Sequence, residues 1–348
     1  MTPKWSAIEA KALNNEALTS EEALSVLNSS NDELMELVGA ARRVREKFFG
    51  KKMKLNYLVN VKSGLCPEDC HYCSQSKDSQ APIPKYPMMH SNDVIEHAER
   101  GMAVGAVRAC LVASGRGPSN RELNEFCDSV KGLKDKHPNL EVCACLGLLQ
   151  EGQAEKLKEA GVHAYNHNIN TSKKHYEKIC GTHGYDDRLD TMKKAADQGL
   201  SPCSGILVGM GETNDDIVDM AMTLRGKAAC SIPVNFLVSI DKTPLQRTNN
   251  LTPEKCLRVL ALMRFMNPSV ELRIAGGREL NLRTLQPLGF MIANSIFIGD
   301  YLTTLGQSPT ADLEMIRDLG YTVLGQPDDF LDKLLSQPKP ELKTLEHV

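Results

Sequence analysis

Short apolar, β-branched runs alternate along most of the chain with longer amphipathic segments. The amphipathic segments begin at polar residues that commonly start helices, among them Ser91, Ser119, Thr213 and Thr252. The apolar runs have the length and composition of buried strands. We expect eight strands, at residues 54–61, 106–113, 140–146, 164–169, 202–208, 234–240, 270–275 and 293–298.

Eight alternations of strand and helix predict an α/β fold with a parallel sheet. Eight such units in roughly 250 residues are typical of a closed (β/α)8 TIM-type barrel. An open, doubly wound sheet is the alternative, because alternation alone does not distinguish closure. We expect an N-terminal helical extension over residues 1–52, with its helical pattern from about Thr19 to Lys52. The barrel would occupy residues 53–322, and a C-terminal tail with a short helix would occupy 323–348.

Composition and charge exclude several classes of protein. The 348 residues include 41 Lys and Arg against 44 Asp and Glu, a formal charge of −3, which argues against a nucleic-acid binder that works by bulk electrostatics. No apolar run approaches the roughly 18 residues that a membrane span needs. The first residues are acidic, with Glu9 and Glu16, and lack the apolar core of a signal peptide. We therefore expect a cytoplasmic protein.

The eleven cysteines are unusual for such a chain. In a reducing compartment, clustered cysteines are more often metal ligands than disulfides. Cys66, Cys70 and Cys73 directly follow the first predicted strand, at the end where barrel active sites are built. Structural zinc usually takes four ligands, and the chain has no second CxxC pair, although His71 could add a ligand. Three thiolates suit an iron–sulfur cluster with one open iron, so the cluster is favoured over zinc.

At this motif the sequence resembles a known family. A CxxxCxxC motif after the first strand of a β/α chain is similar to the radical S-adenosylmethionine superfamily. The surrounding segment KSGLCPEDCHYCSQS (62–76) resembles the biotin synthase family more specifically. Similar blocks follow in order, covering about residues 37–320: YNHNINTS (165–172), CSGILVGMGET (203–213), RIAGGRE (273–279) and ANSIF (293–297).

The resemblance implies an activity and its cofactors. Cys66, Cys70 and Cys73 would bind a 4Fe–4S cluster whose open iron is chelated by S-adenosylmethionine. Electron transfer from this cluster would generate a 5′-deoxyadenosyl radical. The reaction would insert sulfur into dethiobiotin to form biotin, the final step of biotin biosynthesis, with a second, 2Fe–2S cluster as the sulfur donor.

A second set of residues lies within the predicted strands. Cys110, Cys143 and Cys203 are each best interpreted alone as small buried residues. Arg273 is different, because a buried guanidinium must be paired or hydrogen-bonded. Inward-facing residues on these strands could converge inside a closed barrel, and the resemblance assigns all four to the 2Fe–2S cluster. Cys145 would face the same side as Cys143. It could compete with Cys143 for iron or fill a neighbouring layer of the barrel, and we favour Cys143 as the ligand. The remaining cysteines, for which we predict structural roles, are Cys127, Cys180, Cys230 and Cys256.

Further contacts follow from the resemblance. Asn168 and Asn170 are two residues apart on the fourth predicted strand, so both could point into the barrel. The resemblance implies that both contact the ribose of S-adenosylmethionine and that Asn168 also contacts the substrate. Many members carry Asp at the position of Asn170. Arg188, otherwise a solvated helix residue, would bind the carboxylate of S-adenosylmethionine as a planar fork. Tyr72 would lie by the adenine. Asn235 would contact the ureido ring of dethiobiotin, to which an amide can both donate and accept.

The resemblance also implies partners and leaves alternatives. We expect an electron donor of the flavodoxin or ferredoxin type, a homodimer, and no catalytic residue beyond the clusters. Lys242 stands where the family often has glycine, on a predicted loop. The alternatives are a related radical enzyme, as in hydrogenase maturation or the pyrrolysine pathway, and a protein that stores or relays metal. The four residues of the second set, together, favour sulfur insertion.

Overall fold

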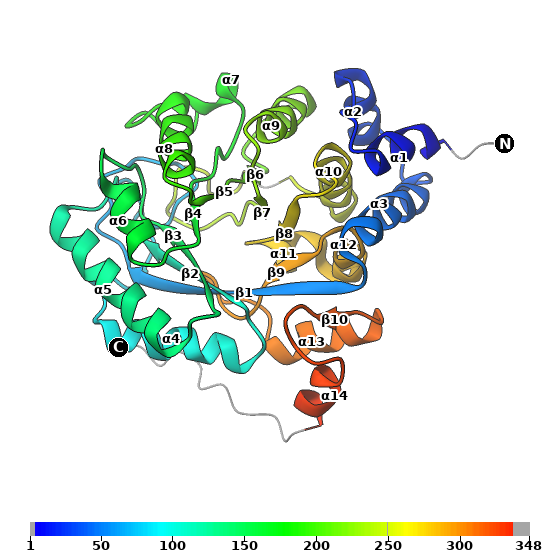
Figure 1. The fold of residues 1–348 in the computed structure, drawn as a ribbon. Helices are drawn as coiled ribbons and strands as arrows, with labels where there is room; N and C mark the ends of the chain where they lie inside the picture. The colour runs from blue at the N-terminus through cyan, green and yellow to red at the C-terminus, as the bar shows by residue number, and fades with distance from the viewer. Residues whose placement is uncertain (1–3, 249, 337–348) are drawn as a thin grey trace.

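Parallel strands closed into a barrel form the centre of the computed structural model, which describes residues 4–248 and 250–336 (Figure 1). Neighbouring strands pair in the order β1–β2–β3–β4–β5–β7–β8–β9, and β9 pairs back onto β1. This last pairing closes the barrel, which confirms the predicted (β/α)8 fold and excludes the open sheet. The strands are β1 (Lys52–Lys62), β2 (Arg108–Ala113), β3 (Glu141–Cys145), β4 (Ala164–Asn166), β5 (Ser201–Cys203), β6 (Ile206–Val208), β7 (Ser231–Phe236), β8 (Glu271–Ile274), β9 (Ser295–Phe297) and β10 (Thr322–Val323).

Helices surround the barrel and begin largely where the polar pattern predicts. Thr19, Ser119 and Thr213 each accept a hydrogen bond from the third residue of their helix in a capping box. Thr252 caps a helix whose first residue is Pro253. The helices around the barrel are α4 (Ser91–Ala103), α5 (Asn120–Lys136), α6 (Gln153–Glu159), α7 (Lys173–Tyr176), α8 (Tyr185–Asp197), α9 (Asn214–Gly226), α10 (Pro253–Met266), α11 (Arg278–Leu282), α12 (Gln286–Ile292), α13 (Pro309–Asp318) and α14 (Phe330–Leu335).

The extension before the barrel is helical, and its first helix begins ahead of Thr19, where the helical pattern was expected to start. It forms three helices, α1 (Ser6–Leu13), α2 (Ser20–Leu27) and α3 (Leu34–Phe49), because polar turn residues at 28–32 interrupt the pattern. These helices lie on one side of the barrel against α9, α10 and α12 (Figure 1). The strand β10 pairs with the start of β1 beside the barrel. The division of the chain into domains at 52 and 322 stays a prediction, and residues 337–348 of the predicted tail lie outside the described residues.

Three predicted strands have the wrong bounds. The run 202–208 is two short strands, β5 and β6, separated at Gly205, where the backbone passes so close to Pro233 that a Cβ would lie 1.8 Å from its carbonyl oxygen. The run 164–169 ends as a strand at Asn166, and the run 234–240 starts at Ser231 and ends at Phe236. In the last two cases the residues beyond the strand belong to loops at one end of the barrel.

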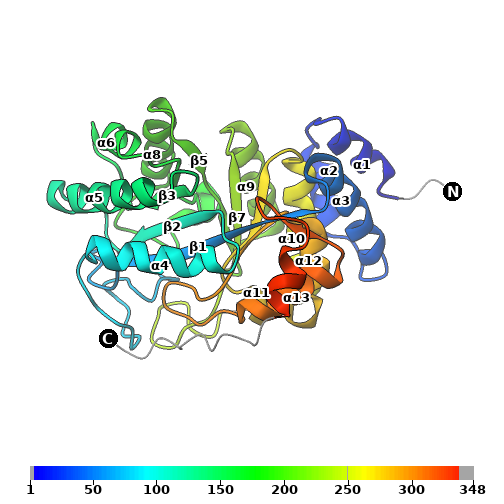
Figure 2. The ribbon, with the colours of Figure 1, turned by 60° about the horizontal axis from the view of Figure 1, so that its bottom comes forward.

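The loops after β1, β7 and β9 gather at the carboxyl end of the strands (Figure 2). The amide of Gln80 donates to the carbonyl of Lys242 at 3.0 Å, and the hydroxyls of Ser74 and Thr303 lie 2.7 Å apart. Lys242 has φ +65°, a conformation that glycine adopts at lower cost, which explains why glycine suits this position. Among the described helices, none combines the length and apolar character that crossing a membrane requires.

Candidate active site

A cavity of about 310 Å³ opens at the carboxyl end of the barrel, between the loop after β1 and the barrel interior. Ligand sites in barrels of this type are built at this end. Most of the residues predicted from the sequence line this one cavity: Tyr72, Cys73, Cys110, Cys143, Cys145, Asn168, Asn170, Asn235 and Arg273. Cys73 represents the first predicted set at this cavity, and Cys110, Cys143 and Arg273 represent the second. The predicted residues that do not line it are Cys66, Cys70, Cys203 and Arg188.

The loop that carries Cys66, Cys70 and Cys73 is held in shape by its own backbone. The amide of Cys73 donates to the carbonyl of Cys70 at 3.0 Å, which closes a tight turn. Gln75 accepts a hydrogen bond from the amide of Gly64 at 2.8 Å. Burial raises the pKa of Cys73 to about 11 and also raises the pKa of Cys66, so both thiols need a cationic partner to become thiolates at neutral pH. Three such thiols on one loop suit an iron–sulfur cluster.

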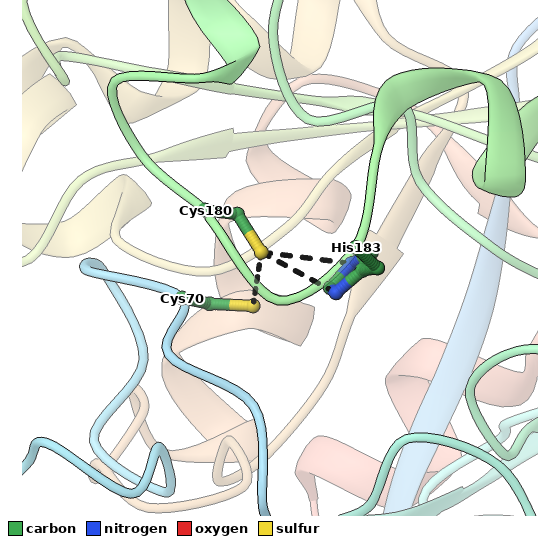
Figure 3. A group of neighbouring side chains, drawn as sticks. All are labelled: Cys70, Cys180 and His183. Atoms are coloured by element: carbon green, nitrogen blue, oxygen red, sulfur yellow. Dashed lines mark hydrogen bonds between the residues drawn. The ribbon is translucent and has the colours of Figure 1, made fainter.

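A second segment of the chain packs against this loop and was not anticipated. Cys180, predicted to be structural, places its Sγ 3.7 Å from Sγ of Cys70, with His183 beside both (Figure 3). Asp69 joins the two segments, because its carboxylate accepts from the amides of Gly181 at 3.0 Å and Thr182 at 3.1 Å. The sequence does contain an indication of this group, since Cys180 and His183 are three residues apart, a spacing compatible with shared metal binding.

The three cysteines of the second set form one buried group. Cys110 and Cys143 are directly paired across β2 and β3, and Cys203 lies on β5. All three pack together with Ala164, Ala275 and Phe297. Hydrogen bonding to Cys143 lowers the pKa of Cys203, and the nearby cations of Arg273 and Arg108 lower it further. Cys145 lines the cavity but lies outside this group, and burial raises its pKa to about 12.

A layer of buried charged residues lies next to the cysteine group. Arg273 pairs with Glu271, donates to the hydroxyl of Ser231 at 2.9 Å, and places its guanidinium over the ring of Phe297. Arg108 also pairs with Glu271 at 3.2 Å. Burial opposes ionisation of Glu271, but the two arginines outweigh it and lower the pKa of this carboxyl.

Sequence reasoning found Arg273 in this layer and missed Arg108 and Glu271. Both missed residues lie two positions from a predicted ligand, Arg108 before Cys110 and Glu271 before Arg273. Side chains two apart in a strand face the same side. This spacing could have identified them.

Asn168 and Asn170 both line the cavity, but not through the strand alternation that was predicted. They lie beyond the end of β4, and Asn170 has φ +65°, a left-handed conformation that asparagine tolerates better than most residues. Its side-chain amide donates to the hydroxyl of Tyr72 at 2.6 Å. The side-chain oxygen of Asn168 accepts from the amide of Gly205 at 2.9 Å, which orients its NH₂ group. The two side chains are therefore fixed before any ligand binds.

Arg188 is buried and not solvated. It lies in the first turn of α8, where its guanidinium donates to the carbonyl of Asn168 at 2.9 Å, to Nε2 of His183 at 2.9 Å and to the hydroxyl of Tyr176. Burial disfavours the cation, but the neighbouring phenols of Tyr72 and Tyr176 help to raise its pKa. Arg188 therefore stays charged beside the cysteine loop.

Asn235 on β7 lines the cavity and already has two backbone partners. Its NH₂ group donates to the carbonyl of Ile206 at 3.2 Å, and its oxygen accepts from the amide of Gly276 at 3.1 Å. One N–H and one lone pair remain, so the side chain can still donate one hydrogen bond and accept one. Asn235 thus also ties β6 to the loop after β8.

Two family models match consecutive parts of the chain. The model described as the radical SAM superfamily matches residues 60–224, and the model described as the biotin and thiamin synthesis associated domain matches residues 233–322. The first match contains the cysteine loop, Cys110, Cys143 and Cys203. The second contains Asn235 and Arg273.

Curated relatives match over nearly the whole chain. A biotin synthase from Streptomyces avermitilis is 54% identical over 315 residues, which are 90% of this chain and 81% of the relative. A biotin synthase from Bacillus licheniformis is 53% identical over 320 residues, 92% of this chain and 96% of the relative.

Solved structures with the same fold share little sequence with the chain. Methylornithine synthase superposes with a TM-score of 0.80 at 19% identity, covering 91% of this chain and 97% of that one. The FeFe-hydrogenase maturase HydG from Carboxydothermus hydrogenoformans has a TM-score of 0.78 at 17% identity, covering 91% and 78%. These two likenesses concern the fold alone. On the strength of the curated relatives and the two family models, the chain belongs to the biotin synthase family of radical S-adenosylmethionine enzymes.

Proposed function

We propose that the chain inserts a sulfur atom between C6 and C9 of dethiobiotin to form biotin, at the cavity between the cysteine loop and the buried cysteine group. The observation that carries this proposal is that Cys73 of the loop, Cys110 and Cys143 of the buried group and Asn235 all line the same cavity. A substrate held there would lie between a radical source and a sulfur source. This arrangement is needed when one ligand must react with both.

The residues present fit the two clusters. Cys66, Cys70 and Cys73 would hold a 4Fe–4S cluster with one iron open for S-adenosylmethionine. When bound, the clusters supply the electron that cleaves the sulfonium and the sulfide that enters the product. The second cluster, 2Fe–2S, would be held by the remaining ligands: Cys110, Cys143, Cys203 and Arg273. The donor chemistry supports this set, because three thiols and one arginine converge in a buried group with charge support from Arg108.

The other residues bind and orient. The guanidinium of Arg188 would bind the carboxylate of S-adenosylmethionine. To do so, it would give up its hydrogen bond to Nε2 of His183. Asn168 and Asn170 would contact the ribose, and their fixed side chains lower the entropy cost of binding. Tyr72, held by Asn170, would lie against the adenine. The apolar wall of the cavity excludes water from a reactive radical.

The partners and the compartment are part of the proposal. A donor of the flavodoxin or ferredoxin type would supply electrons, and the chain would act as a homodimer. All eleven cysteines are free thiols, which suits a reducing cytoplasm. Catalysis would need no residue beyond the cluster ligands and the binding contacts.

Replacing Asn235 by alanine is expected to weaken dethiobiotin binding by about 1–3 kcal/mol, because the ureido ring would lose a hydrogen-bond partner in a buried place. Affinity for S-adenosylmethionine should change much less. The variant should also lose some stability, since Asn235 bonds to Ile206 and Gly276. The measurement is calorimetric titration of the folded, cluster-loaded protein with dethiobiotin.

Asn267→Ala is the matched control, because Asn267 is a buried amide just after α10 that does not line the cavity. Its dethiobiotin affinity should equal that of the native protein. The substrate assignment is refuted if the native protein does not bind dethiobiotin. The role of Asn235 is refuted if the two variants bind it equally.

A further inference from the structure

Three potential metal ligands meet beside the cysteine loop, outside the cavity. Cys70 comes from the loop after β1, and Cys180 and His183 come from the segment between α7 and α8 (Figure 3). All three are buried, and their ligand atoms lie within 4.8 Å of one another. The expected mechanism uses Cys70 but assigns no role to Cys180 or His183.

The distances in this group suit one tetrahedral metal ion. Two thiolates at about 2.3 Å from a tetrahedral ion are about 3.8 Å apart, and the Sγ atoms of Cys70 and Cys180 are 3.7 Å apart. A thiolate and an imidazole nitrogen on the same ion are about 3.6 Å apart. In His183, Nδ1 lies 3.3 Å and Nε2 lies 3.9 Å from Sγ of Cys180. The donor atoms are therefore nearly in place.

The surroundings of His183 are those of a metal-bound imidazole. Nδ1 of His183 contacts the carboxylate of Glu68, which would fix the ring and leave Nε2 for the metal. Nε2 now accepts from Arg188 and lies 3.0 Å from the hydroxyl of Tyr176, and an ion would displace both contacts.

The charges around the group also balance. A divalent ion adds to the positive charges of Arg188 and of Arg116, which pairs with Glu68 at 3.1 Å. The negative charges are two thiolates, Glu68, and Asp69, whose oxygen is 3.3 Å from Sγ of Cys180. A neutral site results, which offsets part of the cost of burying the ion.

We propose that the cluster-free protein binds one divalent transition-metal ion through Cys70, Cys180 and His183. Cys70 cannot serve this ion and the 4Fe–4S cluster together, so the two occupants exclude each other. The exclusion rests on the proposed role of Cys70 in the cluster, whereas binding of the ion does not. The ion would be ferrous iron or zinc. Zinc would have to leave before the cluster can form, whereas ferrous iron could leave or become part of the cluster.

Titration of the anaerobic, cluster-free protein with Co²⁺ tests this proposal. Tetrahedral Co²⁺ with thiolate ligands has strong visible d–d bands and a thiolate-to-cobalt charge-transfer band. We expect both bands to saturate at about one ion per chain. Cys180→Ser and His183→Gln, shown to be folded by circular dichroism, should each weaken binding at least about 100-fold, more than the loss of an outer partner costs.

Cys66→Ser and Cys256→Ser are the controls. Cys66 belongs to the cysteine loop but not to this group, and Cys256 is a buried thiol on α10. Both should retain the cobalt spectrum. Loss of the spectrum in Cys66→Ser with retention in Cys180→Ser would place the ion on the loop cysteines and overturn the proposal, as would retention in all variants. Failure here leaves the proposed function intact, since that function is tested by reaction products and not by cobalt.

Discussion

Cys203→Ala is expected to abolish biotin formation while leaving the cleavage of S-adenosylmethionine intact. Cys203 packs with Cys110 and Cys143 in the buried group, remote in sequence from the cysteine loop. Removing it should therefore empty the sulfur-donor site and spare the radical-generating one. We expect biotin yield to fall at least about 100-fold, since loss of a direct ligand exceeds the cost of losing an outer partner. Biotin, 5′-deoxyadenosine, iron and sulfide are measured on the same reconstituted sample.

Cys145→Ala is the matched control for this prediction. Cys145 also lies on the barrel interior and lines the cavity, but it is not part of the buried cysteine group. Its loss removes little volume, so the stability should change modestly and metal content should not change. If the two variants behave alike in metal content and in biotin formation, the second cluster is not held as proposed.

Cys66→Ala is expected to reduce the cleavage of S-adenosylmethionine to the background level. Two remaining loop thiols cannot hold a cluster that needs three and keeps one iron open. Replacing Cys66 is a more decisive test than replacing Cys70. Sγ of Cys180 lies 3.7 Å from Sγ of Cys70, so Cys180 could take the place of Cys70 as a ligand. The measurement is 5′-deoxyadenosine formed per chain under reducing, anaerobic conditions.

The control for this variant is Cys127→Ala, since Cys127 is a buried thiol on α5 away from both cysteine groups. Its yield of 5′-deoxyadenosine should match that of the native protein. An undiminished yield in Cys66→Ala would remove Cys66 from the cluster.

The regular part of the fold was predictable because local patterns determine it. Apolar runs and helix caps such as Thr213 located most strands and helices within a few residues. Barrel closure was not visible locally, because it depends on the pairing of β9 with β1, which are far apart in the chain. Strand ends were misjudged where the chain leaves the barrel at the site. After Phe236, for example, Leu237 and Val238 are apolar enough to continue a strand, but they lie beyond its end and line the cavity.

The site was predictable where a motif carries it and not where partners come from distant segments. The loop cysteines and the buried cysteines were identified by motif and resemblance. Cys180 was missed because its contact with Cys70 spans 110 positions in the chain. The environment of Arg188 was also missed, since a helix arginine is usually solvated and only the folded chain places Tyr176 and His183 around it.

Counting iron and sulfide shows whether one barrel holds two different iron–sulfur clusters. The native protein is reconstituted anaerobically, freed of unbound metal and assayed for both elements per chain. We expect about six iron atoms and six sulfides per chain, four of each from one cluster and two from the other. About four of each, with no further uptake under any reconstitution condition, would contradict it.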